Sequence, residues 1–239
     1  MRSPYGLDIP ENCLNCTLRS EKFFCSLPSQ ALKSFDAISS PASYPKDATL
    51  FVEGQAPRGL YVLCSGRIKL SMGSADGKVL ILRVAEPGDL LGLSATISGT
   101  PYELTAETME PSQVTFIKRD DFLRFLREHT DACFRAAQNL SDRYDVVCRE
   151  IRSLGLSHSA AEKLAKLLLE WSARGAAAGK SAGRITMTMT HEEIAQMIGT
   201  SRETVTRIFS EFKKKQIIRL KGATLEIRNS GALEALVNS

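Results

Sequence analysis

The stretch GTSRETVTRI (residues 199–208) carries polar and basic residues where a buried helix would be apolar. Just before it, Thr190 can cap a helix, and Glu193, three residues later, is the matching partner of a capping box. Gly199 suits the end of that helix because glycine adopts the left-handed turn conformation without strain. Ser201 can then cap a second helix. Two short helices joined by a Gly-containing turn predict a helix-turn-helix.

The second of these helices has two different faces. Apolar residues at helical spacing form a stripe that we expect to be buried, made of Val205, Ile208, Phe209 and Phe212. The outer, N-terminal face carries Ser201, Arg202, Glu203, Thr206 and Arg207. In a helix-turn-helix this face enters the major groove, where Arg can donate two hydrogen bonds to guanine and Glu can accept one from cytosine. A solvated helix face with a local ion pair would use the same residue types, but the complete spacing favours DNA recognition.

A hairpin of the winged kind is expected after the second helix. Ile217–Leu220 and Thr224–Ile227 read as strands joined by a turn that contains Gly222. Lys214 and Lys221, together with the lysines on either side of Lys214, can reach DNA phosphates.

The whole chain has a net charge of +4, and the positive excess lies in its C-terminal third. From Gly155 onward there are 13 Lys and Arg against 8 Asp and Glu, whereas the first 154 residues hold 18 against 19. This asymmetry favours a polyanion partner such as double-stranded DNA, although a surplus of this size also suits a soluble surface.

The composition is that of an ordinary soluble protein, with 43% apolar and 24% charged residues. The sequence has neither a signal-peptide pattern nor a window of about 18 apolar residues, so we expect a cytoplasmic protein without a membrane span. His129, His158 and His191 share no ligand spacing, and no Gly-rich phosphate loop or nucleophile motif is present. These features disfavour an enzyme.

The region from Ala48 to Ile117 reads as short β-branched runs separated by turn residues. Asp76-Gly77 between two apolar runs is a strong hairpin signal. Many short strands at this spacing predict a β-sandwich or barrel, with helical flanks around residues 30–38 and from Asp120 onward.

The next segment carries an apolar pattern with an average period of 3.5 residues. Its members are Cys133, Ala137, Leu140, Tyr144, Val147, Ile151 and Leu154. Such a seam over three heptads predicts that two helices bury it against each other, which implies a homodimer. A single helix lying on its own β-domain would also account for the stripe.

Three cysteines near the N-terminus, Cys13, Cys16 and Cys25, have the spacing C-x2-C-x8-C. A C-x2-C step can present two thiolates to one metal, although simple packing of these cysteines is the alternative. A disulfide framework is not expected in a cytoplasmic DNA-binding protein. Cys133 and Cys148 read as small core or interface residues.

The chain resembles the CRP/FNR family of bacterial transcription regulators over nearly its whole length. The motifs that carry the resemblance are GLYVLCSGRIKL (59–70), DGKVLILRVAEPGDLLG (76–92) and IAQMIGTSRETVTR (194–207). The resemblance implies DNA and RNA polymerase as partners.

It also implies an α+β fold of two domains. We expect a Cys-containing segment at residues 1–29 and a β-jelly-roll of the cyclic-nucleotide-binding type at residues 30–129. A long dimerisation helix at residues 130–154 should follow, and then a winged helix-turn-helix domain at residues 155–239.

Within the family, an Arg-Glu pair and a later Arg in the recognition helix are typical of the cyclic-AMP receptor branch. Arg202, Glu203 and Arg207 match this pattern, which implies a half-site resembling TGTGA. The FNR branch reads DNA through Glu, Ser and Arg, for which Glu203, Thr206 and Arg207 would serve. Arg202 favours the first branch.

The expected effector pocket departs from the family pattern for cyclic nucleotides. There, Gly-Glu binds the ribose, and an Arg-Ser or Arg-Thr pair neutralises the phosphate. Here Leu93 follows Gly92, and Tyr102 and Glu103 stand where Arg and Ser are expected. A carboxylate at that place would repel a phosphate, which disfavours cyclic AMP bound in the usual way.

Iron–sulfur sensors of the FNR type also carry three closely spaced N-terminal cysteines, with a fourth in the β-roll. Cys13, Cys16 and Cys25 resemble the first three, but Thr115 stands at the fourth position. Cys64, the other cysteine of the β-roll, lies at an unmatched place. The resemblance therefore implies, as the alternative function, a regulator that senses redox conditions through an iron–sulfur cluster or thiols.

Overall fold

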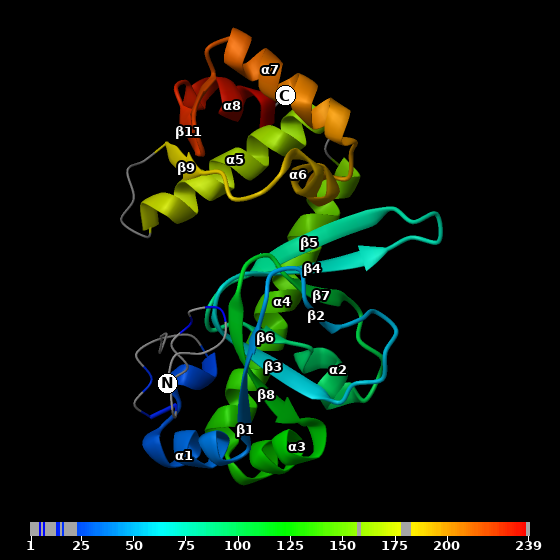
Figure 1. Ribbon diagram of the computed structural model, residues 1–239, viewed down its shortest axis with the longest axis vertical. Coiled ribbons are helices and arrows are strands. Elements are labelled where there is room, and N and C mark those ends of the chain that lie inside the picture. Colours follow the sequence, from blue (N-terminus) through cyan, green and yellow to red (C-terminus); the bar gives the residue numbers. More distant parts are fainter. Residues whose placement is uncertain are drawn as a thin grey trace. The chain divides into compact units, whose positions relative to one another are not determined.

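The computed structural model describes residues 5, 7, 13, 14, 16, 23–156, 159–177 and 183–237 (Figure 1). The chain divides into two compact units, Met1–Val146 and Val147–Ser239. The division falls inside one continuous helix, α4 (Thr130–Leu156), rather than in a loop. This helix includes residues 130–154, the range expected for the long dimerisation helix, and continues for two further residues.

The first unit contains a β-roll built from two four-stranded antiparallel sheets, with strand orders β1-β8-β3-β6 and β2-β7-β4-β5. The strands are β1 (Ser39–Tyr44), β2 (Thr49–Phe51), β3 (Gly59–Ser65), β4 (Ile68–Gly73), β5 (Val79–Ala85), β6 (Leu90–Leu91), β7 (Thr105–Thr108) and β8 (Ser112–Lys118). Successive strands mostly change sheet, as in a jelly roll, which confirms the predicted architecture.

The Asp76-Gly77 hairpin is present as predicted. Strands β4 and β5 pair from Ile68↔Ala85 to Gly73↔Val79, and Gly77 has a φ of 77° in the turn between them. A positive φ of this kind is why glycine occupies the position.

Two elements of the β-roll were not predicted, β1 and the short helix α2 (Leu93–Ser98). Strand β1 has the sequence SSPASY, which carries neither an apolar run nor a clear alternation. It is an edge strand that pairs with β8 along its whole length, from Ser39↔Ile117 to Tyr44↔Ser112. The backbone hydrogen bonds to β8 therefore create a strand that the local sequence does not specify.

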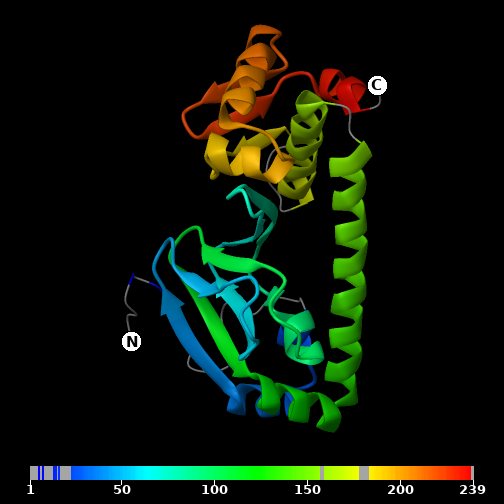
Figure 2. The same ribbon diagram turned by 90° about the vertical axis from the view of Figure 1, so that its right-hand side faces the viewer.

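Helical elements cover the outer face of β3. They are η2 (Phe23–Ser26), α1 (Ser29–Ala37), α3 (Arg119–Glu128) and the first turns of α4. Figure 2 shows the first part of α4 running alongside the β-roll. Phe24 stacks on Phe35 with ring centroids 5.3 Å apart and meets Phe122 edge-on at 5.7 Å. Leu60 and Val62 of β3 belong to the same apolar cluster. Burial of these side chains fixes the helical layer against the sheet.

A buried ion-pair network connects α4 to the β-roll. Asp89, in the turn before β6, accepts hydrogen bonds from Arg83 of β5 at 2.8 Å and from Arg143 of α4 at 2.9 Å. The backbone N–H of Glu86 donates to the same carboxylate at 3.1 Å. Burial alone would raise the pKa of Asp89, but the two guanidinium groups outweigh it, and the pKa is lowered.

The second unit packs four helices on a three-stranded antiparallel sheet of order β10-β11-β9. Its elements are α5 (Ala160–Ala177), β9 (Arg184–Thr186), α6 (His191–Ile198), α7 (Arg202–Lys214), β10 (Ile218–Lys221), β11 (Thr224–Ile227) and α8 (Ser230–Val237). The predicted apolar stripe of α7 is buried in the core of this unit. Strands β10 and β11 form the predicted wing.

Candidate functional site

The helix-turn-helix has the predicted local structure. Thr190 and Glu193 form a complete capping box at the start of α6. Gly199 ends that helix with a φ of 65°, in the left-handed region. The hydroxyl of Ser201 accepts a hydrogen bond from the backbone N–H of Thr204 at 3.2 Å, which caps α7. These local signals account for the orientation of α7 relative to α6.

The expected base-reading side chains lie together on the exposed face of α7. Ser201, Arg202, Glu203, Thr206 and Arg207 are all exposed, while Val205 between them is buried in the core. The pKa of Glu203 is lowered by hydrogen bonds from its own backbone N–H and from Ser201, so the side chain is a carboxylate acceptor. Such a surface offers both donors and acceptors to base edges.

Arg207 has a partner within the same helix. Its guanidinium donates to Glu211 at 3.0 Å, an i to i+4 ion pair between two exposed side chains. A helix face that is only solvated would also carry a local ion pair, and in this helix that pair joins Arg207 to Glu211. An exposed pair of this kind contributes about 0.3–0.5 kcal/mol, so it leaves Arg207 able to turn toward a base.

One histidine contacts the reading face, although the sequence patterns did not assign it to that face. His191, the first residue of α6, stacks on Phe209 at 5.0 Å, and its Nδ1 lies 2.9 Å from the Thr206 hydroxyl. Thr206 donates its own hydrogen to the carbonyl of Arg202. The Nδ1 of His191 is therefore the donor to Thr206. Burial, Arg202 and Lys213 lower the pKa of His191, which keeps the ring neutral at pH 7.

The lysines expected to reach phosphates flank the reading face. Lys213 and Lys214 lie in the last turn of α7, and Lys221 lies at the tip of the wing beside Gly222. All three side chains are exposed. Their positions suit contacts with the DNA backbone, which bind without reading sequence.

The predicted seam of α4 is largely exposed within the single chain. Tyr144, Val147 and Ile151 are 70%, 47% and 66% exposed, and Cys133 and Ala137 are exposed as well. Leu140 is half-buried against the helical layer of the first unit. Leu154 belongs to α4, but its side chain lies outside the described part of the structure.

A different face of α4 packs on the β-roll. Ala132, Ala136 and Asn139 are buried there, and Arg143 continues the same face. The seam is therefore not needed for the contact between α4 and its own β-domain. Phe134, which is 64% exposed, widens the apolar surface beyond the predicted residues.

Two of the four expected effector residues, Gly92 and Tyr102, lie against each other, whereas Leu93 is buried in the apolar cluster beneath the helical layer. Tyr102 is 3% exposed, its ring stacks on Phe51 with centroids 4.1 Å apart, and its hydroxyl donates to the carbonyl of Gly59. Gly92 has a φ of 76°, and a Cβ there would lie 2.6 Å from the Tyr102 ring. Glu103 is exposed, so it does not belong to this buried group.

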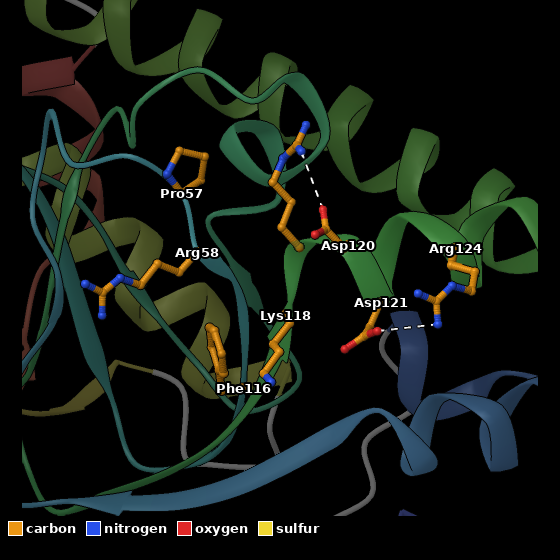
Figure 3. A pocket seen from close by; sticks show the side chains of 8 residues that line it. Pro57, Arg58, Phe116, Lys118, Asp120, Asp121 and Arg124 are labelled. Carbon is orange, nitrogen blue, oxygen red and sulfur yellow. Dashed lines mark ion pairs between the residues drawn. The ribbon is translucent and has the colours of Figure 1, made fainter.

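A cleft of about 640 Å³ lies elsewhere on the β-roll, where β8 leads into α3 (Figure 3). None of the four expected effector residues lines it. Its two carboxylates are paired locally, Asp120 with Arg119 at 3.9 Å and Asp121 with Arg124 at 3.6 Å. The lining of the cleft carries four basic side chains, Arg58, Lys118, Arg119 and Arg124, against these two carboxylates.

The six cysteines form no disulfide. Burial, followed by a hydrogen bond to Asp36, raises the pKa of Cys13 to about 12. Burial raises the pKa of Cys64 to about 11. Cys133 and Cys148 are exposed on α4 within the single chain. Among the residues that the structure describes, no group of three or more His, Cys, Asp or Glu side chains is placed to hold a metal ion.

Two family patterns match the chain. One is the cyclic nucleotide-binding domain, over residues 41–129, and the other is the Crp-like helix-turn-helix domain, over residues 162–236. In the described part of the chain, no helix is both long and apolar enough to span a membrane.

Known relatives and structures cover most of the chain. A protein of Mycobacterium tuberculosis named CRP-like cAMP-activated global transcriptional regulator is 28% identical over 193 residues, which are 81% of this chain and 86% of the relative. The nitrogen fixation regulation protein FixK of Bradyrhizobium diazoefficiens is 26% identical, over 94% and 93% of the two chains. The solved structure of FixK2 from Bradyrhizobium japonicum has a TM-score of 0.72 at 24% identity and covers 83% of this chain and 97% of its own.

Proposed function

The chain belongs to the CRP/FNR family of transcription regulators, whose helix-turn-helix domain binds DNA, and we propose that it reads palindromic TGTGA-like sites as a homodimer. The single observation that carries this proposal is the exposed row formed by Arg202, Glu203, Thr206 and Arg207 on a well-capped α7. RNA polymerase is the further partner that family membership implies.

The homodimer is supported by the exposed seam of α4. Tyr144, Val147 and Ile151 form an apolar row on a helix whose other face already packs on the β-roll. Two such helices side by side would remove both rows from water. The pair would then hold two recognition helices about 34 Å apart, the separation of successive major grooves on one side of DNA.

Control by cyclic AMP in the usual way is not part of this function. The Tyr102 ring fills the buried space beside Gly92, and Leu93 stands where a ribose-binding Glu is expected. The nearby carboxylate of Glu103 would repel a cyclic phosphate. The relative from Mycobacterium tuberculosis is named cAMP-activated, so this chain is proposed to differ from it.

We expect millimolar cyclic AMP to leave both the melting temperature and the DNA affinity unchanged. A ligand that binds only the folded protein stabilises it by about 2.7 kcal/mol at a hundredfold excess over Kd. Thermal unfolding with and without the nucleotide measures this directly, with AMP as the control for non-specific effects. A rise in melting temperature seen with cyclic AMP alone would contradict the proposal.

Arg202→Ala tests the reading face. We expect about 1–3 kcal/mol of lost affinity for the palindrome and relaxed selectivity at one base pair, because a bidentate contact to guanine is removed. Lys214→Ala is the matched control, since loss of a phosphate contact weakens binding to all sequences alike. Fluorescence anisotropy against the TGTGA palindrome and a scrambled duplex, across a salt series, distinguishes the two.

The proposal fails if Arg202→Ala weakens the palindrome and the scrambled duplex equally. It also fails if the wild-type protein does not distinguish the two duplexes, either in its reduced, metal-free form or after anaerobic reconstitution with iron and sulfide.

A further inference from the structure

The hydroxyl of Thr206 forms two hydrogen bonds inside the protein. It donates its hydrogen to the carbonyl of Arg202, one turn earlier on α7, at 2.9 Å. It accepts a hydrogen bond from the Nδ1 of His191 on α6, also at 2.9 Å. Because a hydroxyl group has a single hydrogen, Thr206 keeps none for a base. It therefore cannot donate to guanine N7 or O6, or to thymine O4, in the major groove.

The same two bonds determine which part of the Thr206 side chain faces outward. One partner, His191, belongs to the neighbouring helix α6, and the other is the backbone of α7 itself. Thr206 is nevertheless exposed. Since the hydroxyl is turned toward α6 and the backbone, the methyl group is what Thr206 presents on the reading face.

His191 is held in place by the core of the second unit. Its ring stacks on Phe209 with centroids 5.0 Å apart and an interplanar angle of 12°, and Phe209 is 1% exposed. Threonine in a helix otherwise divides between two χ1 rotamers. A donor fixed on the neighbouring helix favours the rotamer that brings the hydroxyl within its reach. His191 thus acts on the reading face through Thr206.

We propose that His191 is a positioning residue that turns the methyl group of Thr206 toward the major groove, where it recognises the 5-methyl group of a thymine. Thymine alone among the four bases carries a methyl group there, and a threonine methyl is a suitable apolar partner for it. Thr206 lies one turn from Arg202, so the two side chains, about 5–6 Å apart at Cβ, should reach neighbouring base pairs. Each guanine of TGTGA follows a thymine, which fits. This inference rests on the proposed reading face.

The test replaces thymine by uracil, which differs from thymine only in lacking the 5-methyl group. Each thymine of the TGTGA half-site, on either strand, is replaced one at a time in the labelled palindrome, and fluorescence anisotropy gives the Kd. We expect one of these replacements to weaken wild-type binding about fourfold for each half-site, as the loss of one buried methyl contact implies. Binding of the variants is then compared on the thymine and uracil duplexes that differ at this position.

Two Thr206 variants separate the methyl group from the hydroxyl. Thr206→Ser keeps the hydroxyl and lacks the methyl, so it should bind the thymine and uracil duplexes equally. Thr206→Val keeps a methyl and lacks the hydroxyl, and valine is restricted to one χ1 rotamer in a helix, so the preference for thymine should remain. Thr204→Ser makes the same change two residues earlier on α7, outside the reading face, and should keep the wild-type preference.

Two His191 variants separate the hydrogen-bond donor from the stacked ring. His191→Phe keeps a ring against Phe209 but has no donor, so the preference for thymine should fall to about twofold or less as both Thr206 rotamers become populated. His191→Asn loses the ring but places an amide N–H near the position of Nδ1, so it should restore the preference. A merely structural role of His191 would give the reverse order. Circular dichroism and the melting temperature show whether each variant is folded.

The proposal is overturned if the wild type binds every uracil duplex as tightly as the palindrome, or if Thr206→Ser keeps the preference for thymine. It is likewise overturned if His191→Phe keeps that preference or if folded His191→Asn does not restore it. Failure of the proposed reading face is seen separately, because the wild type would then not distinguish the palindrome from the scrambled duplex before any uracil is introduced.

Discussion

Val147→Glu combined with Ile151→Glu is expected to convert the protein into a monomer that no longer binds the palindrome tightly. In a dimer the two substitutions remove four apolar side chains from the interface, and burial of each contributes about 1.5–3 kcal/mol. They also place carboxylates opposite one another. The dimer should weaken by at least about a hundredfold, which corresponds to 2.7 kcal/mol. Sedimentation velocity measures the loss of the dimer, and fluorescence anisotropy with the labelled palindrome measures the loss of DNA binding.

Gln138→Glu is the matched control for this variant. It adds a carboxylate to the same helix at an exposed position outside the seam. We expect it to remain dimeric and to bind the palindrome as the wild type does. If the double variant stayed dimeric at protein concentrations at which the wild type is dimeric, the dimer interface would have to lie elsewhere.

Asp89→Ala should cost about 3 kcal/mol of folding free energy. Removing one partner of a buried ion pair leaves charge without compensation, which typically costs 3–5 kcal/mol. The low end is expected because the Arg83 and Arg143 side chains are 18% and 28% exposed and keep some contact with water. Urea unfolding followed by circular dichroism gives the value, with Asp76→Ala in the exposed hairpin turn as control.

The Asp89 carboxylate should also make the folding stability depend on pH in the acid range. Because the folded-state pKa of Asp89 is lowered, its contribution is complete above its unfolded pKa of about 3.9. The contribution is lost as the pH falls through the lower folded-state pKa. The stability difference between the wild type and Asp89→Asn should therefore shrink as the pH is lowered below about 4. A difference that stayed constant down to pH 2 would mean that another group stabilises this turn.

The helix-turn-helix could be predicted from the sequence nearly residue by residue. Thr190, Glu193, Gly199 and Ser201 each act on atoms a few positions away, through a cap or a turn conformation. The hairpin at Asp76-Gly77 and the period of the α4 seam are local in the same sense. Signals of this range can be read without knowing the fold.

Other features depend on residues far apart in the chain. Strand β1 exists because β8 supplies its hydrogen-bond partners, and Tyr102 fills the roll because Gly92 leaves room for its ring. The pairing of His191 with Thr206 likewise follows from the docking of two helices.

The sequence by itself thus determined the fold family, the recognition helix and the apolar seam, because caps, turns and periodicity are properties of neighbouring residues. Only the tertiary structure decided that Asp89 joins Arg83 to Arg143 and that Tyr102 fills the space beside Gly92. Those contacts join side chains that strand pairing and core packing bring together, and no spacing along the chain records them.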